Sequence, residues 1–299
     1  MQIFVASPRG FCAGVVRAID TVEIALKRFG VPVYVKHQIV HNQFVVDSLE
    51  AKGAITVDDI DNIPMESVVV FSAHGSPPID YKKAAARRLK VIDATCPLVT
   101  KVHNEARKYS AENNKIILIG HKGHQEVQGT MGQTNMKLID EREGPNLPNW
   151  ESNSPVVVLT QTTLSVADTE STVKEIGKKF PNMKVRNDIC YATTNRQRAV
   201  RELVLKVDLL LVIGSQTSSN CNRLTEVARQ FGVPSYLING PDEIEPEWLL
   251  NYNRIGITSG ASTPEELVER VIKAIGASKI TALEGVEEDI TFVLPQEIK

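Results

Sequence analysis

Three segments of this chain end in a cysteine: IFVASPRGFC at residues 3–12, LKVIDATC at residues 89–96 and MKVRNDIC at residues 183–190. In each segment a run of β-branched residues predicts a strand. The residues after each cysteine have the apolar spacing of a helix, and the predicted helices span residues 13–29, 97–112 and 191–207. The same order of strand, cysteine and helix therefore recurs three times along the chain.

Short apolar runs alternate with helical patterns through the rest of the sequence. They lie at residues 33–35, 68–71, 91–92, 116–119, 156–159, 184–185, 209–213 and 255–258. Strands that are apolar throughout are typical of parallel sheets covered by helices on both faces. The expected fold class is therefore α/β. The threefold recurrence predicts three related α/β lobes with mainly parallel sheets around a pseudo-threefold axis.

The recurrence also predicts the lobe boundaries. The expected lobes are residues 13–96, residues 97–190, and residues 191–280 completed by residues 1–12, followed by a C-terminal tail at 281–299. The third lobe takes the N-terminal strand because no further junction of strand, cysteine and helix follows residue 207. We interpret the acidic residues 284–289 of the tail as a solvated surface. Ser165 and Thr263 are expected to be helix N-caps.

Composition excludes several classes of protein. The 34 basic and 36 acidic side chains give a net charge of −2, whereas a nucleic-acid-binding domain is usually basic. No apolar run approaches the roughly 20 residues of a membrane span, and the chain begins with a strand-like segment rather than a signal peptide. The four cysteines are widely spaced, as in proteins of a reducing compartment. We therefore expect a cytoplasmic protein that binds neither nucleic acid nor membrane.

The recurring cysteines are Cys12, Cys96 and Cys190, each at the carboxyl end of a predicted strand, where parallel α/β sheets place their sites. Around a common axis the three thiols would meet at one point. Zinc usually binds close Cys-x₂-Cys pairs, which this chain lacks, whereas three thiolates from separate lobes suit an iron–sulfur cluster with one open iron. The alternative is three small buried residues. Cys221 is interpreted as a small residue at a helix start, with a fourth ligand as its alternative.

Polar residues on glycine-rich loops follow several other predicted strands. Imidazoles, hydroxyls and amides near helix starts are suited to binding a phosphate group. The candidates include His41, His74, His124, Thr162, the run Ser218, Ser219 and Asn220, and Ser262. Glu126 would be well placed as a proton donor beside a redox cluster, although it could instead only favour the start of a helix.

Longer motifs in the chain resemble a known family. The segments PRGFCAGVVRAI, IVHNQFVVDSL, FSAHG, DATCPLVTKVH, GHKGHQEVQGTMGQ, TQTTLS, DICYATTNRQ, SSNCNRL and SGAST look like 4-hydroxy-3-methylbut-2-enyl diphosphate reductases nearly from end to end. The resemblance implies a three-lobed α/β fold around a central site with one [4Fe-4S] cluster per chain. It also implies the last step of the methylerythritol phosphate route of isoprene biosynthesis.

In that reaction the hydroxyl of (E)-4-hydroxy-3-methylbut-2-enyl diphosphate is removed reductively, giving isopentenyl and dimethylallyl diphosphate. The resemblance implies that the open iron binds the substrate hydroxyl. The electrons would pass through the cluster from a small ferredoxin or flavodoxin.

By motif, the resemblance implies that Cys12, Cys96 and Cys190 are the cluster ligands and that Glu126 supplies protons. Thr162 would lie near the substrate hydroxyl. The implied diphosphate-binding residues are His41, His74, His124, Ser218, Ser219, Asn220 and Ser262. The family commonly has Ser at the position of Cys221, so this chain carries an extra thiol. Two other functions stay open: a zinc-dependent phosphohydrolase that uses the loop histidines and Glu126, and a non-catalytic diphosphate-binding protein.

Overall fold

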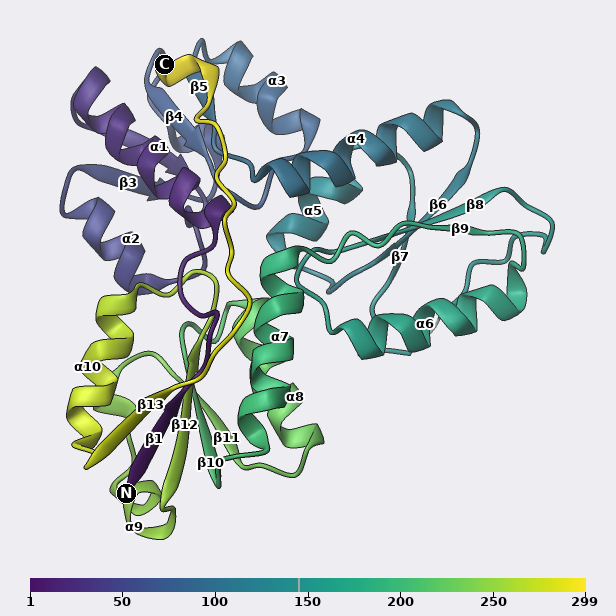
Figure 1. Ribbon diagram of the computed structural model, residues 1–299. Coiled ribbons are helices and arrows are strands. Elements are labelled where there is room, and N and C mark those ends of the chain that lie inside the picture. The colour runs from purple at the N-terminus through teal and green to yellow at the C-terminus, as the bar shows by residue number, and fades with distance from the viewer. Residues whose placement is uncertain (145) are drawn as a thin grey trace. The chain divides into compact units, whose positions relative to one another are not determined.

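The computed structural model describes residues 1–144 and 146–299 of the chain (Figure 1). These residues form two compact units. The first unit contains Met1–Val15, His41–Val45 and Tyr191–Thr291. The second contains Val16–Val40, Val46–Cys190 and Phe292–Lys299.

The first unit is built on a parallel five-stranded sheet in the order β11-β10-β12-β1-β13. Its strands are β1 (Gln2–Val5), β10 (Leu209–Ile213), β11 (Ser235–Ile238), β12 (Arg254–Ser259) and β13 (Lys279–Ala282). Apolar residues of α7 (Tyr191–Val204) and α8 (Ser219–Gln230) pack on one face, and those of α9 (Pro246–Asn251) and α10 (Glu265–Ile275) pack on the other (Figure 1). The short helix η2 (Pro241–Glu243) precedes α9. Because all strands run in the same direction, the loops after β1, β10 and β12 leave from one edge of the sheet.

The second unit contains two four-stranded parallel sheets, β3-β2-β4-β5 and β7-β6-β8-β9. The strands of the first are β2 (Val33–Lys36), β3 (Ala54–Val57), β4 (Val68–Phe71) and β5 (Lys90–Asp93). Those of the second are β6 (Lys115–Ile119), β7 (Lys137–Ile139), β8 (Val156–Thr160) and β9 (Lys184–Val185).

Helices cover the sheets of the second unit. Apolar residues of α4 (Pro97–Ala111) and α5 (Gln125–Met131) pack on one face of the β7-β6-β8-β9 sheet, and α6 (Val166–Lys179) packs on the other. A separate cluster joins the β3-β2-β4-β5 sheet to η1 (Ile60–Asn62) and α3 (Pro78–Ala86). The remaining elements are α1 (Ala13–Phe29), α2 (Gln43–Glu50) and η3 (Gln296–Ile298).

Three parallel sheets with covering helices confirm the expected fold class of three α/β lobes. The N-terminal strand β1 pairs with β12 and β13. The lobe boundaries stay a prediction; β13 ends at Ala282, inside the segment expected to be a tail. Helix α1 has the predicted bounds, and Gly30 after it adopts the left-handed φ of 77° that favours glycine.

The two expected N-caps have different outcomes. Ser165 caps α6, because its side chain accepts a hydrogen bond from the N–H of Asp168 at 3.2 Å. The prediction for Thr263 is wrong: its hydroxyl donates to the carbonyl of Ile213 at 2.9 Å, and Pro264 occupies the N-cap of α10. Within the described residues, no helix has the length and apolar character needed to cross a bilayer.

Candidate functional site

Cys12 lies at the end of the loop that follows β1 in the first unit. The N–H of Gly10 donates to the Ser259 hydroxyl at 2.9 Å, and the N–H of Cys12 donates to the Ala261 carbonyl at 3.2 Å. The N–H of Ala13 donates to the hydroxyl of Tyr191 at 3.2 Å. These bonds hold the loop after β1 against the end of β12, the loop that follows it, and the start of α7. The side chain of Cys12 is partly exposed.

The start of α8 carries three of the predicted diphosphate-binding residues. Ser218 is the N-cap, and its hydroxyl accepts from the N–H of Cys221 at 3.4 Å. Asn220 is 3% exposed, and neither atom of its side-chain amide has a hydrogen-bond partner within the described residues. An unpaired buried amide is unfavourable, whereas a phosphate at a helix start would supply acceptors for its N–H groups. Nearby in this unit, the Ser262 hydroxyl donates to the His41 carbonyl at 3.0 Å.

Cys221 belongs to the apolar core on the α7 and α8 face of the sheet. It is fully buried, and burial raises the pKa of its thiol to about 11. A Cβ at Gly214 or Gly260 would overlap its sulfur, so both glycines are required for this close packing. These contacts favour the interpretation of Cys221 as a small core residue over its alternative as a fourth ligand.

Cys96 and Cys190 lie in the second unit. Cys96 is the N-cap of α4, its N–H donates to the Ala73 carbonyl at 3.0 Å, and its side chain makes no capping hydrogen bond. The positive end of a helix favours the thiolate form of a cysteine at this position. The N–H of Cys190 donates to the carbonyl of Thr162 at 3.0 Å. Both side chains are partly exposed.

Glu126 lies in the first turn of α5 and is 4% exposed. The N–H of Thr162 donates to Oε1 at 2.6 Å, and the Thr162 hydroxyl donates to Oε2 at 2.8 Å. Burial raises the pKa of Glu126 to about 7; the two donors on Thr162 oppose this rise, and the negative charge of Asp188 adds to it. The carboxyl can therefore hold or release a proton near neutral pH, as a general acid requires.

Two of the predicted histidines, His74 and His124, lie near each other in this unit, and His124 contacts Glu126. His124 is the N-cap of α5, and its Nδ1 accepts from the N–H of Glu126 at 3.2 Å. The rings of His74 and His124 are 6.1 Å apart between centroids and nearly perpendicular. The hydroxyl of Ser72 and Nδ1 of His74 are 3.3 Å apart. The loops after β4 and β6, which leave two different sheets of this unit, thus bring polar side chains together.

Sequence reasoning missed the ion pair between Lys101 and Asp188. Lys101 Nζ is 3.2 Å from Asp188 Oδ1, and the aspartate side chain is 1% exposed. The pair joins α4, which begins directly after Cys96, to the segment that ends at Cys190. The only signal in the sequence is that each residue stands a few positions from a recurring cysteine.

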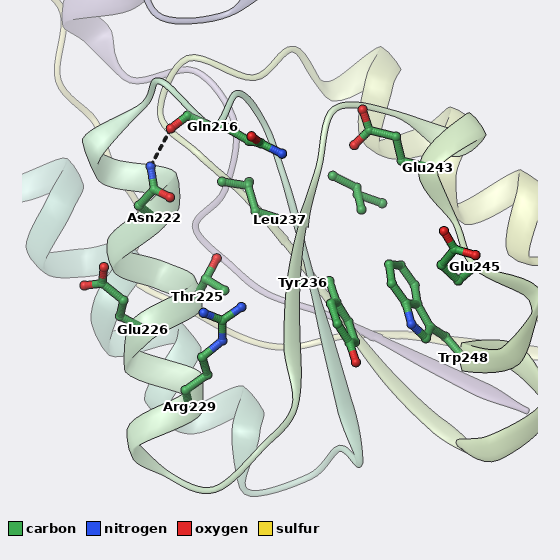
Figure 2. A pocket seen from close by; sticks show the side chains of 11 residues that line it. Gln216, Asn222, Thr225, Glu226, Arg229, Tyr236, Leu237, Glu243, Glu245 and Trp248 are labelled. Atoms are coloured by element: carbon green, nitrogen blue, oxygen red, sulfur yellow. Dashed lines mark hydrogen bonds between the residues drawn. The ribbon is translucent and has the colours of Figure 1, made fainter.

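A cavity of about 570 Å³ in the first unit was also missed (Figure 2). Side chains of α8, β11, α9 and its N-cap Glu245 line the cavity. They include Arg229 and the stacked rings of Tyr236 and Trp248, whose centroids are 4.1 Å apart. No residue of the predicted site lines this cavity.

The predicted site residues divide between the two units. Cys12, His41, Ser218, Ser219, Asn220 and Ser262 lie in the first, and His74, Cys96, His124, Glu126, Thr162 and Cys190 lie in the second. The part of the chain that the structure describes contains no group of three or more His, Cys, Asp or Glu side chains arranged to hold a metal ion.

Parallel sheets, polar loops at their carboxyl edges and a buried carboxyl such as that of Glu126 are typical of α/β enzymes. The chain belongs to the family described as LytB protein, which matches residues 3–276. This match and the named relatives described next confirm the resemblance to 4-hydroxy-3-methylbut-2-enyl diphosphate reductases.

Relatives and a solved structure support this membership. Proteins of Glaesserella parasuis and Bradyrhizobium diazoefficiens are 49% and 50% identical, covering all of this chain and 98% and 99% of the relatives. They are named 4-hydroxy-3-methylbut-2-enyl diphosphate reductase and 4-hydroxy-3-methylbut-2-enyl diphosphate reductase 2. The E-1-hydroxy-2-methyl-but-2-enyl-4-diphosphate reductase of Plasmodium falciparum superposes with a TM-score of 0.94 at 38% identity, covering 100% of this chain and 96% of that one.

Proposed function

We propose that this chain reduces (E)-4-hydroxy-3-methylbut-2-enyl diphosphate to isopentenyl and dimethylallyl diphosphate. The substrate loses its hydroxyl as water and gains hydrogen at carbon, which consumes two electrons and two protons. The names of its relatives and the family membership support this substrate. The site must therefore bind a diphosphate, supply protons and receive electrons.

The buried Glu126 carboxyl is the observation that carries the proposal. A proton donor for this reaction must be protonated near neutral pH, and burial raises the pKa of Glu126 to about 7. The two hydrogen bonds from Thr162 fix the orientation of the carboxyl. Thr162 also accepts from the N–H of Cys190, so the proton donor is linked through one residue to a proposed cluster ligand.

Cys12, Cys96 and Cys190 fit the ligand set of a [4Fe-4S] cluster. Each has a partly exposed side chain, follows a strand and precedes a helix, whereas Cys221 is buried. Thiolates are the usual ligands of such clusters, and the start of α4 favours the thiolate of Cys96. When bound, the cluster would supply one-electron chemistry and a Lewis-acidic iron.

The diphosphate-binding residues are proposed from both units. In the first unit, the buried amide of Asn220 at the start of α8 has no partner among the described residues. Ser218, Ser219, Ser262 and His41 are its proposed neighbours. In the second unit, His74 and His124 add imidazole donors. Binding the diphosphate would hold the reacting carbon in place, a positioning effect worth several kcal/mol. A ferredoxin or flavodoxin is the proposed electron donor, and the cytoplasm the proposed location.

Metal and sulfide analysis after oxygen-free purification tests the proposal, together with product analysis using the reduced protein and the proposed substrate. We expect a brown protein with about four irons and four sulfides per chain, the content of a cubane cluster, and formation of both products. A colourless zinc protein that hydrolyses phosphate esters would contradict the proposal in favour of the phosphohydrolase. A metal-free protein that binds diphosphate without turnover would contradict it in favour of a binding protein.

A further inference from the structure

The C-terminal strap, residues 283–291, runs over the loop that carries Cys12 in the first unit. The N–H of Leu283 donates to the Val5 carbonyl at 2.9 Å, at the end of β1. A Cβ at Gly285 would overlap the carbonyl oxygen of Ser7, so a glycine is needed where the two backbones touch. The strap therefore packs directly on the start of the Cys12 loop.

Arg196 on α7 joins the strap to the same loop. Its side chain is fully buried, and its Nη1 lies 3.1 Å from Oε1 and 3.2 Å from Oε2 of Glu288 in the strap. The Nη2 atom of the same guanidinium donates to the carbonyl of Gly10 at 2.7 Å. Glu288 is 12% exposed and also accepts from the side-chain amide of Asn195 at 3.0 Å. The interpretation of residues 284–289 as a solvated surface is wrong for Glu288.

Both backbone groups of Gly10 are thus fixed from outside the loop. Its N–H donates to Ser259 and its carbonyl accepts from Arg196. Gly10 has a φ of 71°, a conformation that other residues rarely adopt. Cys12 stands two positions further along the chain, so the direction in which this loop leaves Gly10 determines where its thiol is presented.

We propose that Glu288 is a positioning residue for Cys12, acting through Arg196 and the carbonyl of Gly10. A buried guanidinium without its carboxylate is strongly unfavourable. Without Glu288, Arg196 would turn toward water or admit water, and its bond to Gly10 would be lost. The C-terminal strap then supports the Cys12 loop through Arg196. The inference rests on the proposed role of Cys12 as a cluster ligand.

Glu288→Gln tests the proposal against Glu287→Gln, a change of the neighbouring, exposed carboxylate. Hydrogen exchange is measured by mass spectrometry on the cluster-free proteins, in peptides that cover residues 8–13. We expect exchange about tenfold faster or more in Glu288→Gln and no change in Glu287→Gln. After anaerobic reconstitution, Glu288→Gln should lose iron to a chelator about 10- to 100-fold faster than wild type. Losses of this size are typical when a residue that supports a metal ligand is replaced.

A double-mutant cycle shows whether Glu288 acts through Arg196. Adding Glu288→Gln to Arg196→Met should cause no further rise in exchange, and full additivity would contradict the proposed route. Unchanged hydrogen exchange in the single variant Glu288→Gln would overturn the positioning role, whatever the metal content. This result can be obtained even if Arg196→Met does not fold. If Glu288→Gln exchanges faster but the wild-type protein binds no iron, the contact between the strap and the loop is supported and the proposed function is overturned.

Discussion

Replacing Glu126 by Gln should change both catalysis and the pH dependence of stability. Burial raises the pKa of Glu126 to about 7 in the folded chain, against 4.5 for a carboxyl in water. Because the folded-state pKa is raised, the carboxyl's contribution to stability is fully present below pH 4.5 and is lost as the pH rises to about 7. Each pKa unit corresponds to about 1.4 kcal/mol, so the total loss is about 3 kcal/mol.

Gln can keep the local geometry without this pH dependence. Its carbonyl can accept from the N–H of Thr162 and its amide can donate to the Thr162 hydroxyl, while the side chain stays neutral. Between pH 5 and pH 8, the free energy of unfolding of Glu126→Gln should therefore rise by about 2–3 kcal/mol relative to wild type. Turnover should fall by about 10²–10⁴-fold, the usual contribution of a general acid.

Urea denaturation of the cluster-free proteins across this pH range measures the first effect, and anaerobic turnover measures the second. Glu112→Gln, which changes an exposed carboxyl in the same unit, is the matched control and should show neither effect. Infrared difference spectra would follow the protonated carboxyl directly. A titration midpoint near 4.5, or a stability difference that is flat with pH, would refute the assignment of a raised pKa. Full turnover in Glu126→Gln would remove this residue from the mechanism.

Three further substitutions test other contacts of the proposed site. Lys101→Met removes the ion-pair partner of the buried Asp188 carboxylate, so the free energy of unfolding measured with urea should fall by about 1–2 kcal/mol. Iron retention should also weaken. Unchanged iron retention would show that this ion pair has no role in holding the cysteines. Asn220→Ala should weaken pyrophosphate binding, measured by calorimetry, by about tenfold or more. The free energy of unfolding should change little, because the Asn220 amide has no hydrogen-bond partner among the described residues. Cys221→Ser should leave the iron content unchanged, and loss of iron in this variant would show that Cys221 is a ligand. In the wild-type, cluster-free protein, Cys221 should react slowly with iodoacetamide, because burial raises the pKa of its thiol to about 11.

The strands that the sequence pattern missed share a position in the fold. β3, β7, β11 and β13 are all edge strands of their sheets. An edge strand has one partner and more contact with solvent, so its side chains need not form a continuous apolar run. β13 illustrates this, since most of its residues are exposed. The central strands are buried on both faces and were visible for that reason.

Local sequence determined which segments form strands and helices, because backbone conformation and capping depend on near neighbours and on apolar periodicity. It also placed Cys12, Cys96 and Cys190 after strands and before helices, and it identified the family through long motifs. Only the tertiary structure decided which groups meet across the chain: Thr162 with Glu126, and Glu288 with Arg196. Protonation and burial depend on such distant neighbours, because both follow from how much water and charge surround a side chain after folding. No local pattern carries that information.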